Sequence, residues 1–160
     1  TSAGDISLEL WPDKAPQTVG NFVGLARQGF YDGTIFHRVV TGFIIQGGGY
    51  LPDMTAKPAR PAIPNESGNG LANHRATIAM ARTTEPHSAD AQFYINLADN
   101  VTLDPKPTRW GYAVFGEVVE GMEVVDDIGH RATATRADLQ DVPVQPVVIR
   151  KVVVLPAGGP

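Results

Sequence analysis

Short runs of alternating hydrophobic and polar residues recur along the chain and predict β-strands. These runs are Asp5–Leu10, Thr77–Ala81, Gln92–Leu97 and Tyr112–Val119, and the β-branched run Pro146–Leu155 is expected to form a closing strand. Each run is short enough to be a strand. The chain is therefore expected to be mainly β.

Two segments carry helical spacing instead. Apolar residues recur every three or four positions over Val19–Ala26, after Pro16 at a typical helix start and before Gly29 at a typical helix end. A shorter helix is expected over Gly121–Ile128, ending at Gly129. A mainly β chain of this size is expected to remove its free strand edges by closing into a barrel, with the two helices covering the open ends.

The stretch Ile35–Gly49 is predicted to form two short strands joined at Thr41–Gly42. It contains one guanidinium, that of Arg38, among apolar neighbours. Alternation places Phe36 on the same face as Arg38 and His37 on the opposite face, where a structural hydrogen bond is expected for the imidazole. Arg38 has two interpretations at this point. It either reaches water or a distant carboxylate for structural reasons, or it serves a ligand.

The segment Tyr50–Asn73 is crowded with proline and glycine and is predicted to be irregular. It is longer than the roughly 12 to 15 residues usual for a structureless loop, which favours an ordered excursion or a lid.

Composition removes several classes of function. The 160 residues (17.1 kDa) are expected to form one domain, residues 1–160, and the absence of cysteine excludes disulfides and thiolate sites but leaves the redox compartment open. The net charge is −4 with scattered basic residues, so no nucleic-acid partner is expected. No apolar run approaches the roughly 20 residues of a membrane span, and no leader opens the chain at Thr1.

Other candidate chemistry is weaker. The four histidines are dispersed, without a close pair at helical spacing, and no metal site is expected from His37, His74, His87 and His130. His87 and Ser88 are adjacent but lack the G-x-S-x-G turn of a hydrolase. Gly47–Gly49 lacks the lysine of a phosphate loop and is expected either to let the backbone pass close to a neighbour or to let it turn.

The segments FHRVVTGFIIQGGG, TIAMAR, AQFYIN and GYAVFGEVVEGMEVVDDI, in this order, resemble the cyclophilin family of peptidyl-prolyl cis/trans isomerases. The resemblance covers nearly the whole chain and is strongest to bacterial members through GYAVFG, the glycines after Gln46 and the segment Asn65–Arg82. It implies a closed eight-stranded antiparallel β-barrel capped by two α-helices. It also implies a shallow outer groove that binds proline-containing peptides.

Position by position, the resemblance places the catalytic arginine at Arg38. It places the substrate-binding residues at Phe43, Ile44, Gln46, Ala81, Arg82, Gln92, Tyr94, Leu103 and Tyr112. No cofactor or metal is implied. Rotation of an X-Pro bond meets a barrier of about 18–20 kcal/mol, and the twisted amide has a basic proline nitrogen to which an arginine can donate.

Several positions depart from the usual family pattern. Thr41 stands where proline is frequent, and the other departures are Ile44 for methionine, Arg82 for asparagine, Tyr94 for phenylalanine, Tyr112 for histidine and Thr102 for tryptophan. The Tyr94 hydroxyl needs a hydrogen-bond partner or water. Thr102 predicts weak binding of cyclosporin, because tight-binding eukaryotic members have tryptophan there.

The resulting hypothesis is a cofactor-independent isomerase acting on X-Pro bonds in exposed or unfolded protein segments, which assists folding. A proline-peptide binding module or chaperone remains the alternative. A small-ligand carrier is disfavoured because bulky side chains would fill the barrel interior. A monomer is expected, and the compartment stays open between bacterial cytoplasm and periplasm.

Overall fold

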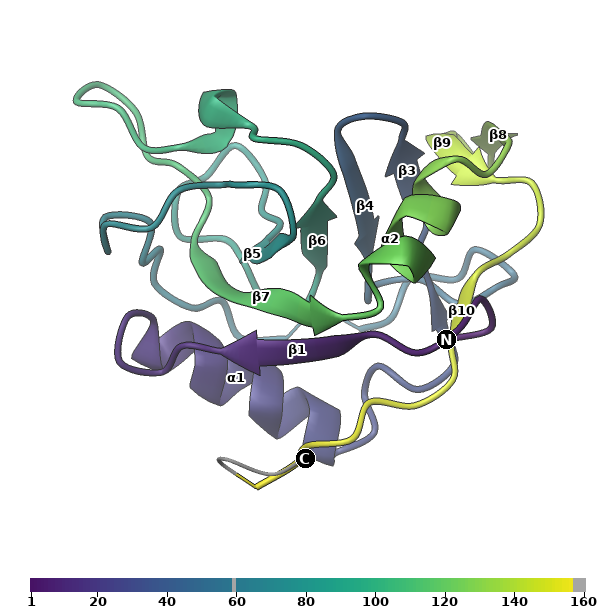
Figure 1. The fold of residues 1–160 in the computed structure, drawn as a ribbon, viewed down its shortest axis with the longest axis horizontal. Coiled ribbons are helices and arrows are strands. Elements are labelled where there is room, and N and C mark those ends of the chain that lie inside the picture. The colour runs from purple at the N-terminus through teal and green to yellow at the C-terminus, as the bar shows by residue number, and fades with distance from the viewer. Residues whose placement is uncertain (59, 157–160) are drawn as a thin grey trace.

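The structure, a computed structural model, describes residues 1–58 and 60–156 (Figure 1). In chain order its elements are β1 (Ser7–Leu10), α1 (Pro16–Arg27), β2 (Thr34–Ile35), β3 (Arg38–Val40), β4 (Ile44–Gly47), β5 (Thr77–Met80), β6 (Phe93–Asn96), the 3-10 helix η1 (Val101–Leu103), β7 (Val114–Glu120), α2 (Met122–Gly129), β8 (Thr133–Arg136), β9 (Leu139–Pro143) and β10 (Val148–Ile149).

Six of these strands form one antiparallel sheet in the order β1-β7-β5-β6-β4-β3, and β10-β2 and β8-β9 form two further antiparallel pairs. The predicted mainly β fold with two α-helices is confirmed. Among the described residues the hydrogen-bonded ladders leave the six-stranded sheet open. Closure into an eight-stranded barrel therefore stays a prediction.

The two faces of this sheet bury different apolar clusters. On one face, Phe22 of α1 packs against Tyr31, Phe93 and Phe115 with ring centroids 5.1–5.6 Å apart, which fixes α1 against β6 and β7. The alternate residues of the strands face the other way and form a smaller cluster centred on Ile44, Ala79, Tyr94 and Val114. The candidate site lies on this second face.

The strands differ from the prediction in two places. The hairpin β8–β9 was not predicted, because its first strand is exposed and polar and shows no alternation; Ala137 and Asp138 join the strands with positive φ angles of 48° and 67°. The closing strand is much shorter than Pro146–Leu155. Only Val148 and Ile149 pair with β2.

The alternation predicted around Arg38 is also interrupted. Phe36 lies in the main core with Val39, at 6.1 Å from the Phe93 ring, and not on the Arg38 face. The reason is that residues 36 and 37 lie between β2 and β3, outside both ladders. His37 is buried against Tyr50, but its Nδ1 atom has no hydrogen-bond partner among the residues that the structure describes, so the expected structural hydrogen bond is wrong for this atom.

The irregular segment Tyr50–Asn73 shows no helix or strand in its described residues, 50–58 and 60–73, as predicted, and it is ordered by a specific contact with α1. Ala15 at the helix start has no capping side chain. Glu66 supplies the cap instead. The Glu66 carboxylate accepts hydrogen bonds from the Gln17 and Thr18 backbone N–H groups at 3.3 and 2.7 Å, and from the Thr18 hydroxyl at 2.6 Å. The segment is therefore an ordered excursion at this point.

Replacing Glu66 with alanine is expected to lower the free energy of unfolding by about 1–2 kcal/mol, because the first turn of α1 loses both its cap and a negative charge near the helix dipole. Urea unfolding followed by circular dichroism measures this change. Glu85→Ala, an exposed carboxylate that no α1 donor contacts, is the matched control. A Glu66→Ala effect below about 0.5 kcal/mol, the range of ordinary surface changes, would contradict the capping role.

Candidate active site

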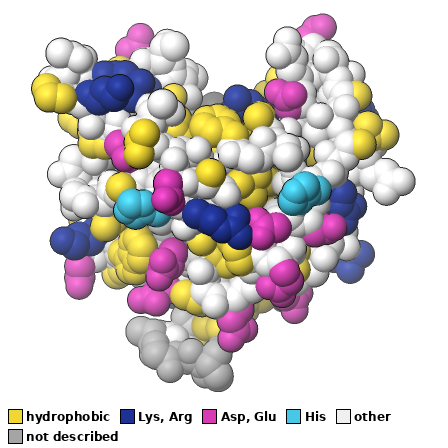
Figure 2. Space-filling model, turned by 45° about the horizontal axis from the view of Figure 1, so that its top comes forward, with side chains coloured by type: hydrophobic (Ala, Val, Ile, Leu, Met, Phe, Trp, Pro, Cys, Tyr) yellow, Lys and Arg dark blue, Asp and Glu magenta, His cyan; other side chains and the backbone are white. Residues whose placement is uncertain are grey.

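A groove of about 220 Å³ lies on the second face of the six-stranded sheet. It is lined by Arg38, Phe43, Ile44, Gln46, Ala81, Arg82, Tyr94, Leu103 and Tyr112. Figure 2 shows apolar side chains gathered in the recess between two projecting lobes, with a basic side chain beside them. The structure thus brings together nine of the ten predicted site residues, and the tenth, Gln92, contacts the groove through Gln46.

Strand register explains why the polar residues of the groove meet. Arg38 on β3 is paired with Gln46 on β4, and Gln46 is paired with Tyr94 on β6, so the three side chains form one row across the sheet. Arg38 Nη1 donates to Gln46 Oε1 at 3.3 Å, and Gln46 Nε2 donates to Gln92 Oε1 at 3.0 Å. Gln92 therefore fixes the orientation of the Gln46 amide.

Arg38 is half-buried and has no carboxylate partner within the described residues. The ion pairs found there are His74–Asp99, Arg75–Asp126 and Arg131–Asp127. Its single side-chain hydrogen bond among these residues is the long one to Gln46. The structural interpretation of Arg38 included pairing with a distant acid, and that pairing is wrong for the described part of the chain. The guanidinium is able to donate to a group that enters the groove.

The apolar part of the groove has Tyr94 as its floor. The Tyr94 side chain is buried, and its hydroxyl donates to Asn73 Oδ1 at 2.7 Å, which supplies the partner that the sequence required. Burial, with smaller contributions from Tyr112 and Asp104, raises the pKa of Tyr94 well above its usual value. The hydroxyl therefore stays protonated. Phe43, Ile44 and Leu103 complete the apolar lining.

Arg82 closes one end of the groove and is largely committed to that structural role. Its guanidinium lies 4.4 Å from the centre of the Tyr112 ring and donates to the carbonyl oxygens of Thr83, Trp110 and Gly111 at 2.8–3.2 Å. An asparagine, the residue frequent in the family, could not reach three carbonyls on two segments. The arginine thus presents its side chain to the groove while its charge is held by the loop.

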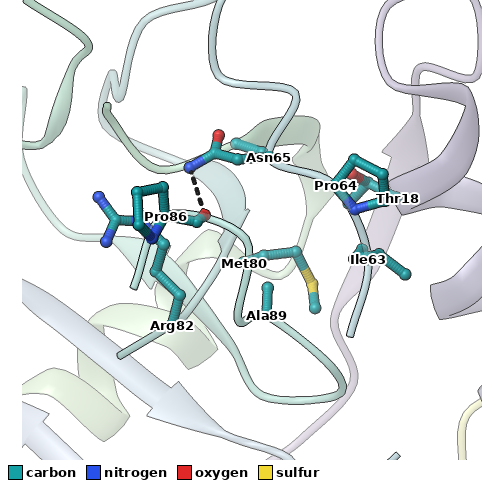
Figure 3. A pocket seen from close by; sticks show the side chains of 9 residues that line it. Thr18, Ile63, Pro64, Asn65, Met80, Arg82, Pro86 and Ala89 are labelled. Atoms are coloured by element: carbon teal, nitrogen blue, oxygen red, sulfur yellow. Dashed lines mark hydrogen bonds between the residues drawn. The ribbon is translucent and has the colours of Figure 1, made fainter. Parts of the chain in front are cut away.

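Arg82 also lines a second, smaller cavity (Figure 3). It has a volume of about 10 Å³, room for about one water molecule, and Asn65 donates to the Pro86 carbonyl at its edge at 3.0 Å.

In the described part of the chain no group of three His, Asp or Glu side chains could hold a metal ion. None of the described helices combines the length and apolar character needed to cross a membrane.

Two residues that support the groove were not predicted as site residues. A Cβ atom at Gly49 would overlap the Gln92 side chain at Nε2, so glycine is required for Gln92 to occupy its position. This confirms the expectation that the glycine run allows close approach. Asn73, the partner of Tyr94, lies in the irregular segment, and the only sequence signal for it was the unpaired hydroxyl of Tyr94.

Comparisons with known proteins agree with this geometry. The family model described as cyclophilin type peptidyl-prolyl cis-trans isomerase/CLD matches residues 1–154. The chain is 55% identical over 158 residues to peptidyl-prolyl cis-trans isomerase cyp18 of Streptomyces antibioticus, covering 97% of this chain and 95% of the relative. It is 52% identical over 157 residues to peptidyl-prolyl cis-trans isomerase B of Escherichia coli, covering 96% of each.

A solved structure supports the same assignment. The cyclophilin type isomerase of Cryptosporidium parvum, crystallised in the presence of the dipeptide Ala-Pro, superimposes with a TM-score of 0.82 at 27% identity, covering 96% of this chain and 94% of that one. The family match, the full-length relatives and the shared fold lead to one conclusion: this chain belongs to the cyclophilin family and is a peptidyl-prolyl cis-trans isomerase.

Proposed function

We propose that this isomerase acts on X-Pro bonds in exposed or unfolded protein segments and so assists their folding, with Arg38 as its catalytic residue. The observation that carries the proposal is a guanidinium, at the edge of an apolar groove, that has no carboxylate partner among residues 1–58 and 60–156. Twisting the X-Pro amide removes its resonance and leaves a lone pair on the proline nitrogen. A donor aimed at that nitrogen binds the transition state more strongly than the planar ground states.

The remaining groove residues hold the peptide while the bond turns. The proline ring packs on Phe43, Ile44, Leu103 and Tyr94, and the Gln46 amide, oriented by its neighbours, hydrogen-bonds the backbone on the rotating side. An acceleration of about 10⁵-fold requires roughly 7 kcal/mol. One charge-assisted hydrogen bond supplies about 1.5–3 kcal/mol, so the apolar lining must supply the rest by desolvating and binding the twisted amide.

The other end of the groove, formed by Ala81, Arg82 and Tyr112, receives the peptide that flanks the X-Pro pair. Gln92 acts through Gln46, to which it is hydrogen-bonded. This arrangement requires no cofactor. No nucleic-acid or membrane partner is proposed.

The test is NMR exchange spectroscopy on a short Ala-Pro peptide with a catalytic amount of the protein. Cis and trans resonances that exchange far faster than the uncatalysed tens to hundreds of seconds, with shifts of groove residues on peptide addition, are the expected result. Peptide binding at the groove without faster exchange would contradict the catalytic assignment. It would favour the alternative of a recognition module.

Cyclosporin is expected to bind weakly, with inhibition only at micromolar or higher concentration, because the small exposed Thr102 offers no aromatic surface beside Leu103. Isothermal titration measures the affinity. Thr102→Trp is expected to tighten binding by about tenfold or more, since a buried aromatic contact contributes in this range. Nanomolar binding by the unchanged protein would contradict the prediction.

We also infer that residues 1–160 act as one domain and as a monomer, and that the strands approach a closed barrel. In support, β3, the last strand of the six-stranded sheet, lies against β9 of the second hairpin. One main apolar cluster connects α1, α2 and the strands between them.

A further inference from the structure

Asn73 is a buried polar residue directly beneath the groove, and it contacts both the floor and one wall. Its Oδ1 atom accepts hydrogen bonds from the Tyr94 hydroxyl at 2.7 Å and from Asn96 Nδ2 at 3.1 Å. Its Nδ2 and backbone N–H both donate to Asp104 Oδ1, at 3.0 and 2.7 Å. The Asn73 side chain thus joins Tyr94, on the floor of the groove, to Asp104, which follows the wall residue Leu103.

The same position is connected to the remaining wall of the groove. The Asn73 carbonyl accepts a hydrogen bond from the Asn100 backbone N–H at 2.8 Å. Asn100 Nδ2 in turn donates to the Phe43 carbonyl at 2.9 Å, and the Asn100 carbonyl accepts from the Leu103 N–H at 3.0 Å. The segments that carry Phe43, Tyr94 and Leu103 are therefore joined to one another through Asn73 and Asn100.

The chemistry of the network requires an amide at this position. The side chain accepts from a tyrosine and donates to a carboxylate at the same time, which is possible for asparagine because it carries both a carbonyl and an NH₂ group. An aspartate would repel Asp104, and an apolar residue would leave the Tyr94 hydroxyl without a partner. A buried network in which every member is paired holds one geometry and resists alternatives.

We propose that Asn73 is a positioning residue of this isomerase: it sets the separation between Tyr94 and Leu103 and thereby the fit of the proline ring. The inference rests on the proposed proline-binding role of the groove. Asn73 does not line the groove, so it acts through the residues it holds.

The test compares Asn73→Leu, a substitution of similar size, with the unchanged protein. The dissociation constant of an Ala-Pro peptide is measured by NMR titration and expressed per folded molecule, with the folded fraction taken from urea unfolding. Asn73→Leu is expected to raise the dissociation constant by about tenfold, as the loss of one or two buried hydrogen bonds predicts. The matched control is Thr34→Val, which removes a buried hydroxyl from β2, outside the groove, and is expected to leave the constant within about twofold.

Two more variants separate positioning from general stability. Asp104→Ala breaks the wall contact at the half-buried end of the network and tests the same role should Asn73→Leu fail to fold; it is expected to weaken peptide binding about threefold or more. Tyr94→Phe removes the hydroxyl and with it the need for a partner. Adding it to Asn73→Leu is therefore expected to recover part of the lost affinity.

If Asn73→Leu folds and binds the peptide within about twofold of the unchanged protein, the positioning role is overturned. If Asn73→Leu does not fold, the same result for Asp104→Ala overturns it. The isomerase assignment stands in both cases. An unchanged protein that neither binds the peptide nor accelerates its exchange would overturn both. The two failures are thus distinguished by the behaviour of the unchanged protein alone.

Discussion

Arg38→Ala is expected to lower kcat/KM for isomerisation of an Ala-Pro peptide by about 10²-fold, equivalent to about 3 kcal/mol of lost transition-state stabilisation. The guanidinium has no carboxylate partner among the described residues and makes a single long hydrogen bond to Gln46 there. Little of the fold depends on it, so the loss is expected in catalysis and not in stability. NMR exchange spectroscopy at equal protein concentrations, with the peptide kept well below saturation, measures the change in kcat/KM.

Arg38→Lys is the matched variant, because it keeps the positive charge but replaces the planar fork with a flexible ammonium. It is expected to retain activity between that of Arg38→Ala and the unchanged protein. Both variants should still bind the peptide through the apolar part of the groove. Isomerisation by Arg38→Ala within twofold of the unchanged rate would contradict the assignment of Arg38 as the donor.

Acid is expected to destabilise the protein through His37, the residue before Arg38. Burial, and secondly the nearby Arg38 charge, lower the pKa of His37 from 6.5 to about 4. The unfolded chain therefore binds one more proton than the folded chain between these two pH values. The contribution of neutral His37 is fully present above pH 6.5 and is lost as the pH falls toward 4, by about 3 kcal/mol in total.

His37→Met, which keeps the volume and removes the titrating group, isolates this effect from that of the carboxylates. Urea unfolding at pH 7 and pH 4 is expected to show a smaller acid-induced loss for His37→Met than for the unchanged protein, by about 3 kcal/mol. His130→Gln, a change at an exposed histidine, should keep the full loss. Equal acid sensitivity of His37→Met and the unchanged protein would contradict the role of His37.

Local patterns determined most of the regular elements. Alternation located β1, β5, β6 and β7, and apolar spacing with a starting proline and a terminal glycine located α1. These signals lie within a few residues of one another, so they are readable from the chain alone. The composition likewise excluded disulfides and thiolate metal sites without any structure.

The groove residues were found through the resemblance, and strand pairing explains their meeting. Arg38, Gln46 and Tyr94 are separated by up to 56 positions, yet two ladder registers place them in one row. Alternation alone placed Phe36 beside Arg38, which was wrong because the break between β2 and β3 resets the side-chain direction. A period-2 pattern holds only while the ladder is continuous.

Tertiary contacts alone decided how polar groups are paired. Glu66 caps a helix 48 residues away, and Asn73 joins Tyr94 to Asp104 across 21 and 31 residues. Buried polar groups need partners, but their chemistry does not say which distant residue provides them. The sequence by itself therefore determined most of the elements, the family and the residue types of the groove. The folded chain decided which donors are bound internally, as in Arg82, and which have few internal acceptors among the described residues, as in Arg38. Only the folded geometry brings distant partners within hydrogen-bond distance.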